Sequence, residues 1–230
     1  MKARIFHNAK KKWAAALARE VGAFLGQKGI ALGAKKADFT VVIGGDGTIL
    51  YNRDILEGAV FGIGSKRSFI CQCTKENWEE ALSAFIAKPA YEERMMLSVS
   101  VGKKKYSALN DVAILSKAHE VLTLAVDIGE DSCTFDADGV VLSTPTGSTA
   151  YAYAAGGPVI EPTLEVFSIV PVAPDKRLFD PMVISSSHKV AISSQSPAHM
   201  VIDGAKPILL KKGEAVRISK NSKKILFAIK

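Results

Sequence analysis

The chain has 230 residues, of which 48% are hydrophobic and 23% charged, a composition typical of a globular protein with a buried core. Lys and Arg exceed Asp and Glu by 30 to 23, and the resulting net charge of +7 favours anionic partners in general. The basic residues are dispersed or form short runs, such as residues 10–12, without interleaved aromatic residues. This distribution is typical of a solvated surface and predicts no nucleic acid partner.

Three cysteines are present, and two of them, Cys71 and Cys73, are separated by a single residue. This spacing matches neither a disulfide framework nor a zinc site, and it favours a reducing cytosol. The N-terminal residues contain no signal-peptide core, and no apolar run approaches the roughly 18 residues that a membrane span requires. We therefore expect a cytoplasmic protein without a membrane partner.

The first ninety residues alternate between strand-like and helix-like patterns. Apolar, largely β-branched runs predict strands at residues 3–6, 39–43 and 59–63. Apolar residues at helical spacing predict helices over residues 11–27, from Thr48 onward, and through Trp78, Leu82 and Phe85 to a stop before Pro89. This alternation predicts an α/β domain with a parallel sheet and crossover helices.

The pattern changes near residue 93, where short strand-like runs separated by turn signals begin. The runs are residues 96–101, 107–115, 121–128, 140–143, 166–172, 183–186, 190–192, 199–202, 208–210 and 215–218. Such a series is typical of an antiparallel β domain. We therefore expect an α/β domain over residues 1–93 and a β-rich domain over residues 94–220.

Two Asp-Gly pairs occur in contrasting contexts. Asp203-Gly204 separates two β runs and therefore predicts the tight turn of a hairpin. Asp46-Gly47 lies in VVIGGDGTIL, residues 41–50, where a strand enters and a helix leaves. A glycine-rich turn of this kind exposes backbone N–H groups that bind phosphate. Asp46 cannot itself hold phosphate, because two anions repel, so it either handles a metal ion or a proton, or it caps the helix.

A third Asp-Gly pair opens the stretch DGVVLSTPTGSTAYAYAAGGP, residues 138–158. Locally, this stretch predicts a strand, a hydroxyl-rich turn, a short N-capped helix and a glycine-proline stop. Its small residues and hydroxyl donors would also allow a ligand to lie against the backbone, with Tyr151 available to stack on a ring. A short helix alone requires no such composition, so we favour a ligand-binding site.

Three separated blocks together resemble the NAD kinase family: GGDGT at residues 44–48, Asn110-Asp111, and residues 138–158. The resemblance implies transfer of the terminal phosphoryl group of ATP, or of inorganic polyphosphate, to the 2′-hydroxyl of the adenosine ribose of NAD. It implies a divalent metal, with Mg²⁺ expected, and a homodimer or homotetramer. It also implies an N-terminal α/β domain with the catalytic loop and phosphate donor, and a C-terminal β domain that binds NAD. Residues 221–230 are expected to return to the first domain.

The resemblance also assigns roles to individual residues. It makes Asp46 the general base and places Gly47 against the nucleotide. It assigns Asn110 and Asp111 to the ribose hydroxyls of NAD, although without it they would be interpreted as a turn pair. The other dinucleotide-binding residues that it implies are Asp138, Thr146, Thr149, Ala150, Tyr151, Ala154 and Ala173.

The sequence departs from the family's pattern at four places. Ala154 stands where the family usually has serine, and Tyr51 and Asp136 stand where a basic residue is common. The glycine-rich segment that the family often carries after the next strand reads GIGSKRSFICQ, residues 62–72. Its Lys66 and Arg67 either replace the missing positive charge or belong to a solvated loop.

Two other functions are considered beside NAD kinase activity. The departures motivate a dinucleotide-binding protein that has lost catalysis, although Asp46 is retained. GGDG also occurs in kinases that act on a lipid or a sugar, but such an enzyme does not account for STPTGSTAY at residues 143–151.

Overall fold

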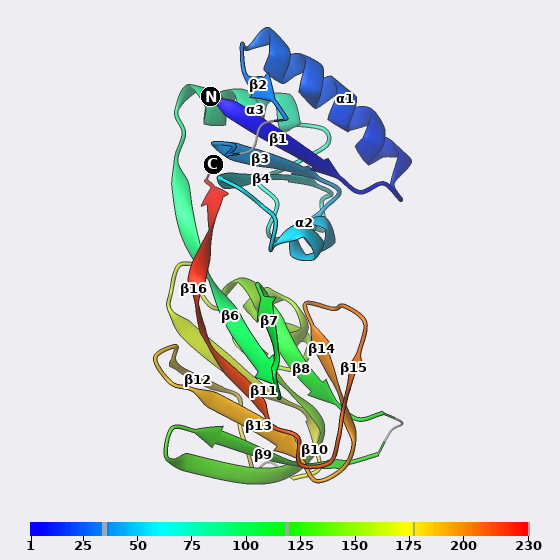
Figure 1. Cartoon of the computed structure of the whole chain (residues 1–230), viewed down its shortest axis with the longest axis vertical. Coiled ribbons are helices and arrows are strands. Elements are labelled where there is room, and N and C mark those ends of the chain that lie inside the picture. Colours follow the sequence, from blue (N-terminus) through cyan, green and yellow to red (C-terminus); the bar gives the residue numbers. More distant parts are fainter. Residues whose placement is uncertain (34–35, 118–119, 177, 230) are drawn as a thin grey trace. The chain divides into compact units, whose positions relative to one another are not determined.

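The computed structural model describes residues 1–33, 36–117, 120–176 and 178–229. The chain divides into two compact units, one formed by residues 1–94 with 225–230 and the other by residues 95–224. The first contains a parallel sheet with helices and the second consists mainly of antiparallel strands (Figure 1). The predicted combination of an α/β part and a β part is confirmed.

The first unit is built on a parallel sheet. Its strands are β1 (Lys2–His7), β2 (Ala31–Leu32), β3 (Phe39–Ile43), β4 (Ala59–Gly64) and β5 (Cys73–Thr74). Its helices are α1 (Lys12–Gln27), α2 (Asp46–Asn52) and α3 (Trp78–Ala87). The strands pair in the order β2-β1-β3-β4, all parallel, and β5 also pairs with β4. The C-terminal end of β16 (Val216–Ala228) completes this sheet, because Phe227 lies in parallel register with Val60 of β4.

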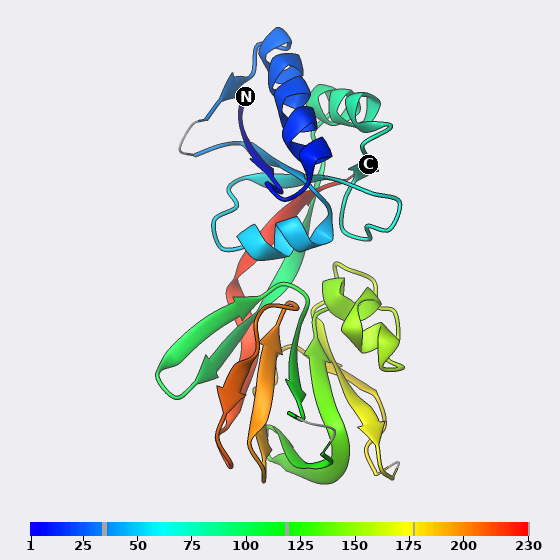
Figure 2. The ribbon, with the colours of Figure 1, turned by 90° about the vertical axis from the view of Figure 1, so that its right-hand side faces the viewer.

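Helical spacing of apolar residues explains how α1 covers the sheet. Its buried residues recur every three or four positions and are Ala14, Leu17, Val21, Phe24 and Leu25. Figure 2 shows α1 and α3 on one side of the sheet and α2 on the other. The Phe24 and Trp78 rings meet edge to face, with centroids 5.4 Å apart. All five residues of β3 are buried, as expected of a parallel strand covered on both faces.

The second unit is an antiparallel assembly centred on the long strand β10. Its strands are the later part of β6 (Tyr91–Val101), β7 (Lys104–Ala108), β8 (Asp111–Leu115), β9 (Leu122–Ile128), β10 (Asp131–Ser143), β11 (Val166–Pro174), β12 (Met182–Ser185), β13 (Val190–Ser194), β14 (Ala198–Ile202), β15 (Ile208–Leu210) and the first part of β16. Strand β10 pairs with β8, β9 and β11, so it connects most of the unit.

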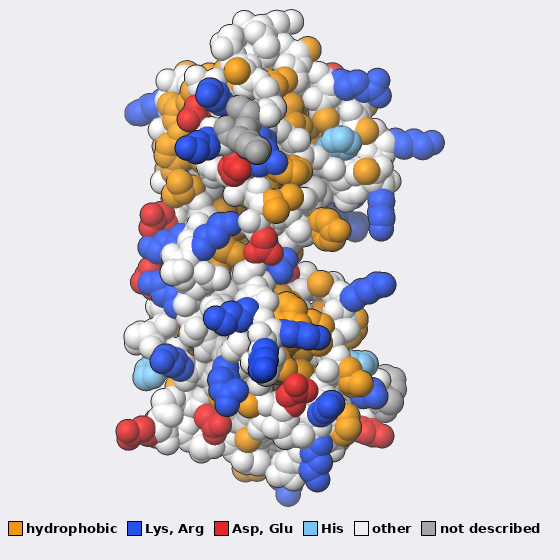
Figure 3. Space-filling view, in the orientation of Figure 1, with side chains coloured by type: hydrophobic (Ala, Val, Ile, Leu, Met, Phe, Trp, Pro, Cys, Tyr) orange, Lys and Arg blue, Asp and Glu red, His pale blue; other side chains and the backbone are white. Residues whose placement is uncertain are grey.

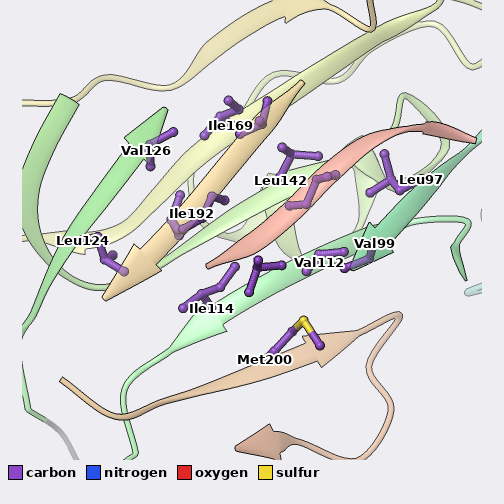
Figure 4. Packing of buried hydrophobic residues seen from close by; sticks show 14 of the residues in the cluster. Leu97, Val99, Val112, Ile114, Leu124, Val126, Leu142, Ile169, Ile192 and Met200 are labelled. Atoms are coloured by element: carbon purple, nitrogen blue, oxygen red, sulfur yellow. The ribbon is translucent and has the colours of Figure 1, made fainter. Parts of the chain in front are cut away.

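Strand alternation divides β10 between two apolar clusters. Val140 and Leu142 point into the main core, where Figure 4 shows Leu142 near Ile169 and Ile192. Val141, on the opposite face, packs with Ala113, Ala152 and Val170. Ala152 belongs to the short helix α4 (Tyr151–Ala154), which follows the 3₁₀ turn η1 (Thr146–Thr149). The stretch of residues 138–158 therefore starts as a central strand and folds back over that strand's outer face (Figure 2).

Several predicted element boundaries are wrong. Helix α2 begins at Asp46 rather than Thr48, and β10 begins at Asp131 rather than at residue 140. The predicted strand over residues 215–218 is the beginning of a longer strand, β16, which continues to Ala228. Helix α4 follows Ala150, which has no side chain able to cap it, so the predicted N-capped helix is also wrong.

The predicted strand over residues 107–115 is interrupted at residues 109 and 110. Strand β7 ends at Ala108 and β8 begins at Asp111. The amides of Leu109 and Asn110 bond to the carboxylate of Asp203 instead of a neighbouring strand. The predicted hairpin around Asp203 is confirmed, because β14 and β15 pair in antiparallel register with Met200 opposite Ile208. Asp203 and Gly204 both have positive φ, 49° and 67°, as a tight hairpin turn requires.

We predict that Phe227→Ala destabilises the first unit. Phe227 is 0% exposed in the C-terminal end of β16, and the Arg94 guanidinium lies 4.6 Å from its ring centroid. Loss of a buried phenyl ring from a close-packed core typically costs about 3–5 kcal/mol. Denaturant unfolding followed by circular dichroism measures this loss. The adjacent Leu226→Ala, at a residue 38% exposed, is the control and should cost under about 1 kcal/mol; equal losses would contradict the prediction.

Candidate active site

Glycine backbone geometry shapes the loop between β3 and α2. Gly44 and Gly45 have φ of 142° and 97°, in the region that favours glycine. A Cβ on Gly44 would lie 2.5 Å from Thr48 Oγ1 and 2.7 Å from Asn8 Cβ, so no side chain fits there. In contrast, a Cβ on Gly47 would meet no heavy atom within 4 Å. Gly47 is therefore exposed, and its lack of a side chain leaves space for a ligand.

Asp46 projects its carboxylate from this loop toward the segment that follows β4. Its Oδ2 accepts a hydrogen bond from the Phe69 amide at 2.7 Å, and its Oδ1 accepts one from the Ile70 amide at 3.2 Å. Gly45 is the N-cap of α2, and no side chain caps the helix. The interpretation of Asp46 as a helix cap is therefore wrong. A carboxylate has about four acceptor positions, so two amide bonds leave room for a proton or another donor.

Two further side chains, neither of them among the predicted site residues, lie at this loop. Burial, followed by the negative charge of Asp46, raises the pKa of the Cys71 thiol, so Cys71 stays protonated beside that carboxylate. Lys11 Nζ donates to the Gly44 carbonyl at 2.6 Å and brings a positive charge to the glycine loop. Lys11 belongs to the basic run of residues 10–12, which was interpreted as a solvated surface.

In the second unit, the Asn110-Asp111 pair lies at the beginning of β8 and is held against residues 144–147. The Thr144 amide donates to the Asn110 carbonyl at 2.8 Å, and Thr144 Oγ1 donates to the Leu109 carbonyl at 2.6 Å. Gly147 permits this contact, because a Cβ there would lie 2.2 Å from the Asn110 carbonyl oxygen. The structure therefore brings Asn110 together with the η1 turn of the motif stretch.

Three polar residues in this region are buried. Asp111 is 5% exposed, Asn110 6% and Thr146 4%. Burial, followed by the charge of Asp203, raises the pKa of Asp111 from its ordinary 3.8 to about 7. Asn110 Oδ1 and Thr146 Oγ1 have no hydrogen-bond partner among the described residues. Buried polar atoms usually have partners, so these two suit a site that receives a polar ligand.

Tyr151 interacts electrostatically with both Asp111 and Asp138. Burial, followed by the charges of Asp111 and Asp138, raises the pKa of the Tyr151 hydroxyl, so the three groups share one electrostatic environment. Ala173 has a positive φ of 45°, unusual for a residue other than glycine and typical of functional sites. Asp138 and Ala173 both fall between the register pairs Ala137–Pro174 and Gly139–Val172, which places them opposite each other on β10 and β11.

The remaining predicted residues follow along the same stretch. Thr149 and Ala150 are half-buried, and Ala154 is exposed. The second unit thus gathers the pair of residues 110–111 with Asp138, Thr146, Tyr151 and Ala173. The first unit separately presents Asp46 and Gly47 on its glycine loop.

Three cavities are found among the described residues, and none of them is lined by a predicted site residue. Two lie against α3 in the first unit: one of about 540 Å³, lined by residues that include Phe61, Phe85 and Ile229, and one of about 500 Å³, lined by residues that include Trp78. The third, of about 400 Å³, lies in the second unit and is lined by residues that include Ser98, Asp127 and Arg217. The candidate site is therefore defined by loop geometry and unpartnered polar atoms rather than by these cavities.

The surface charge is distributed. On the face drawn in Figure 3, Lys and Arg side chains are spread over both units with Asp and Glu side chains among them.

In the parts of the chain that the structure describes, no helix is long and apolar enough to cross a membrane. Across the same residues, no three His, Cys, Asp or Glu side chains are grouped so as to hold a metal ion.

Comparison with known proteins decides the family. A family model described as the ATP-NAD kinase C-terminal domain matches residues 109–229. An NAD kinase from Methanoculleus marisnigri is 34% identical over 220 residues, covering 92% of this chain and 82% of the relative. An NAD kinase from Treponema denticola is 33% identical over 252 residues, covering 96% and 86%. The chain belongs to the NAD kinase family.

Solved structures agree with this NAD kinase assignment. The crystal structure of an NAD kinase from Archaeoglobus fulgidus in complex with ATP matches with a TM-score of 0.86 and 28% identity, covering 99% of this chain and 93% of the other. A yeast NADH kinase complexed with NADH matches with a TM-score of 0.85 at 20% identity, covering 100% and 83%, and shows the shared fold. The resemblance, the fold class and the NAD kinase activity predicted from the sequence are confirmed.

We predict that Asp111→Asn changes how stability depends on pH. Because the folded-state pKa is raised, the native state binds more protons than the unfolded state between about pH 4 and 7. Folding stability therefore falls as pH rises through this window, by at most about 1.4 kcal/mol per pH unit, and the penalty is complete above pH 7. Asparagine cannot ionise and escapes this penalty.

Denaturant unfolding of both proteins from pH 4 to 8 tests this expectation. The stability of Asp111→Asn relative to wild type should rise with pH and level off above about pH 7. Asp138→Asn is the control, because Asp138 is exposed. It shows how much of any change in stability follows simply from removing a carboxylate of this unit. A constant difference between Asp111→Asn and wild type across the range would contradict the burial argument.

Proposed function

We propose that this NAD kinase transfers the terminal phosphoryl group of ATP to the 2′-hydroxyl of the adenosine ribose of NAD, with Asp46 as the general base. The observation that carries the proposal is the Asp46 carboxylate, fixed by two amides at the edge of a glycine loop. A ribose hydroxyl is a poor nucleophile at neutral pH, so transfer benefits from a group that accepts its proton. Asp46 keeps free acceptor positions for that proton.

The donor is proposed to lie against the glycine loop. The related NAD kinase from Archaeoglobus fulgidus was solved with ATP, which supports ATP as donor here, and polyphosphate remains a second candidate. Gly47 leaves open space, and Lys11 Nζ places a positive charge on the Gly44 carbonyl. Backbone amides and a lysine ammonium are groups that stabilise phosphate oxygens.

NAD is proposed to bind the polar region of the second unit. Asn110 and Asp111 suit the ribose hydroxyls, because Asn110 Oδ1 is buried without a partner and Asp111 is buried beside it in the chain. Thr146, with its unpartnered Oγ1, and Tyr151 suit further contacts to the dinucleotide. The remaining proposed contacts are Asp138, Thr149, Ala150, Ala154 and Ala173.

A divalent metal is proposed to act with the donor. Mg²⁺ usually binds one or two carboxylates together with substrate phosphates and water. The described residues contain no cluster of three potential ligands, so the proposed ion would be held mainly by phosphate oxygens and water. When bound, the ion would neutralise phosphate charge. A cytoplasmic homodimer or homotetramer is likewise proposed.

NADP formation from NAD is the assay that tests the proposal. Purified protein receives Mg²⁺ and either ATP or polyphosphate in parallel, and product is followed by a dehydrogenase specific for NADP. Turnover with ATP supports the proposal, and the second arm establishes the range of donors. Binding of NAD without turnover on either donor would favour the alternative of a catalytically inactive dinucleotide-binding protein.

We predict that Asp46→Asn loses at least about a hundredfold in kcat while its Kd for NAD stays near the wild-type value. General-base assistance typically contributes about 10²–10⁴ in rate, and asparagine lacks the basicity. Asparagine also has a single acceptor oxygen, so one of the two bonds to residues 69 and 70 is lost. Steady-state kinetics and a separate NAD titration measure the two quantities.

A loop control separates lost basicity from loop disorder. Ser68 Oγ accepts the Ser65 amide at 3.2 Å, so Ser68→Ala loosens the same loop without altering Asp46. This variant should keep kcat within a few-fold of wild type. If Asp46→Asn retains near-native turnover, or if Ser68→Ala loses as much, Asp46 is a structural residue of the loop. Loss of NAD binding together with turnover would assign Asp46 to ligand positioning.

A further prediction concerns Gly47→Ala, which should separate stability from activity. The added methyl group meets no protein atom within 4 Å and replaces glycine in α2, so stability should stay constant or rise by up to about 1 kcal/mol. If the donor lies against Gly47, the methyl group should raise KM for ATP several-fold. Thermal unfolding and kinetics are measured on one preparation. An unchanged KM for ATP would remove Gly47 from the nucleotide site.

A further inference from the structure

Asp203 stands at the turn between β14 and β15, yet its carboxylate bonds to a segment more than ninety residues earlier. Asp203 Oδ2 accepts the Leu109 amide at 2.9 Å, and Oδ1 accepts the amides of Asn110 and Asp111 at 2.8 and 3.1 Å. In the other direction, the Asp203 amide donates to the Asp111 carbonyl at 3.1 Å. A residue interpreted from the sequence as a hairpin turn therefore makes four hydrogen bonds to the three residues 109–111.

These bonds complete the hydrogen bonding of that segment's backbone. Thr144 supplies the remaining two, through its amide to the Asn110 carbonyl and its hydroxyl to the Leu109 carbonyl. All six backbone polar groups of residues 109–111 are thus bonded, four of them to Asp203 and two to Thr144. The segment is therefore held on one side by Asp203, which follows β14, and on the other by Thr144, which follows β10.

Because this backbone is fixed, the positions of the Asn110 and Asp111 side chains are restricted as well. Asn110 Oδ1 is buried and finds no donor among the described residues, so the backbone hydrogen bonds hold this acceptor where it is unsatisfied. Asp111 is held next to it with its carboxyl buried. Such prior placement avoids the ordering cost that a mobile loop would incur on binding a ligand.

We propose that Asp203 is a positioning residue of the NAD site, which fixes residues 109–111 so that Asn110 and Asp111 meet the dinucleotide ready to bind. The inference rests on the assignment of these two residues to NAD under the proposed function. Asp203 acts through the backbone of that segment and contacts no reacting atom.

The negative charge of Asp203 has a second consequence. Asp203 faces Asp111 from the hairpin turn, and Tyr151 faces it from α4, with Asp138 near that tyrosine. Of these, the Asp203 charge disfavours ionisation of Asp111. Removing that charge should therefore lower the pH at which Asp111 ionises, a change that a purely structural turn residue would not produce.

The test is Asp203→Asn, compared with Gly204→Ala as a matched control. Asparagine keeps the size of the side chain and loses the charge and one acceptor oxygen. Gly204→Ala keeps the carboxylate and disturbs only the turn, because Gly204 has φ of 67° and a Cβ there meets no atom within 4 Å. Kd values for NAD and ATP are measured by calorimetry from pH 5 to 8, together with KM and kcat.

Asp203→Asn should raise the Kd for NAD at least about tenfold, which corresponds to about 1.4 kcal/mol, and leave the Kd for ATP within about twofold. The midpoint of the pH dependence of NAD binding should move to lower pH, and kcat at saturating NAD should change less than KM. Gly204→Ala should bind NAD within a few-fold of wild type.

Three results would overturn the inference: wild-type NAD affinity and pH profile in Asp203→Asn, equal weakening of NAD and ATP, or equal weakening of NAD by Gly204→Ala. If Asp203→Asn does not fold, Asp203→Ser replaces it, because serine keeps one small acceptor and lacks the charge; wild-type affinity there would be equally decisive. Failure of the wild-type protein to bind NAD would instead refute the proposed function.

Discussion

Backbone N–H groups that lie outside a helix or a strand ladder still need acceptors, and in each unit an aspartate side chain supplies them. Asp46 accepts the amides of Phe69 and Ile70, and Asp203 accepts those of residues 109–111. Each aspartate stands beside glycine: Asp46 follows β3 after two glycines, and Asp203 follows β14 directly. The loops that carry the proposed site residues are thereby tied to the rigid part of their unit.

Close backbone approach is the second constraint, and it explains the small residues of the motif stretch. A Cβ on Gly139 would lie 2.4 Å from the Ile114 carbonyl oxygen, and one on Gly147 would lie 2.2 Å from that of Asn110. Both glycines lie in the stretch of residues 138–158 and face the segment from Asn110 to Leu115. The composition interpreted as space for a ligand therefore also allows β10 to approach Ile114 and η1 to approach Asn110.

The elements that the sequence predicted well are those in which local pattern and burial agree. Helix α1 and strand β3 match their predicted ranges because apolar spacing at 3.6 residues, or an unbroken β-branched run, coincides with what the sheet buries. The division of β7 from β8 was not predictable in this way, because it depends on an acceptor at Asp203 that is remote in sequence. For the same reason Asp203 was interpreted only as a turn.

The candidate site was identified by family resemblance more than by pattern. Periodicity favoured neither a base nor a cap at Asp46, and the hydrogen bonds to residues 69 and 70 exclude the cap. The pKa of Asp111 likewise depends on burial between strands and on Asp203, which no local sequence feature specifies. Sequence motifs select residue types, whereas the charge state of a buried group follows from the packing around it.

The departure from the family at residues 62–72 bears directly on Asp46, because this segment holds its carboxylate. The interaction uses the main-chain N–H groups of residues 69 and 70, which every residue except proline provides. Phe69 meanwhile is 73% exposed, so its side chain is not needed to hold the carboxylate. A segment whose side chains differ from the family's glycines can therefore hold the aspartate through its backbone, provided that its turn is retained. Here Ser68 helps to retain it, since its amide donates to the Ser65 carbonyl at 2.9 Å and its hydroxyl accepts the Ser65 amide. The altered sequence is thus compatible with the proposed role of Asp46 as base, and its consequences should be sought in what the exposed Phe69, Lys66 and Arg67 side chains contact.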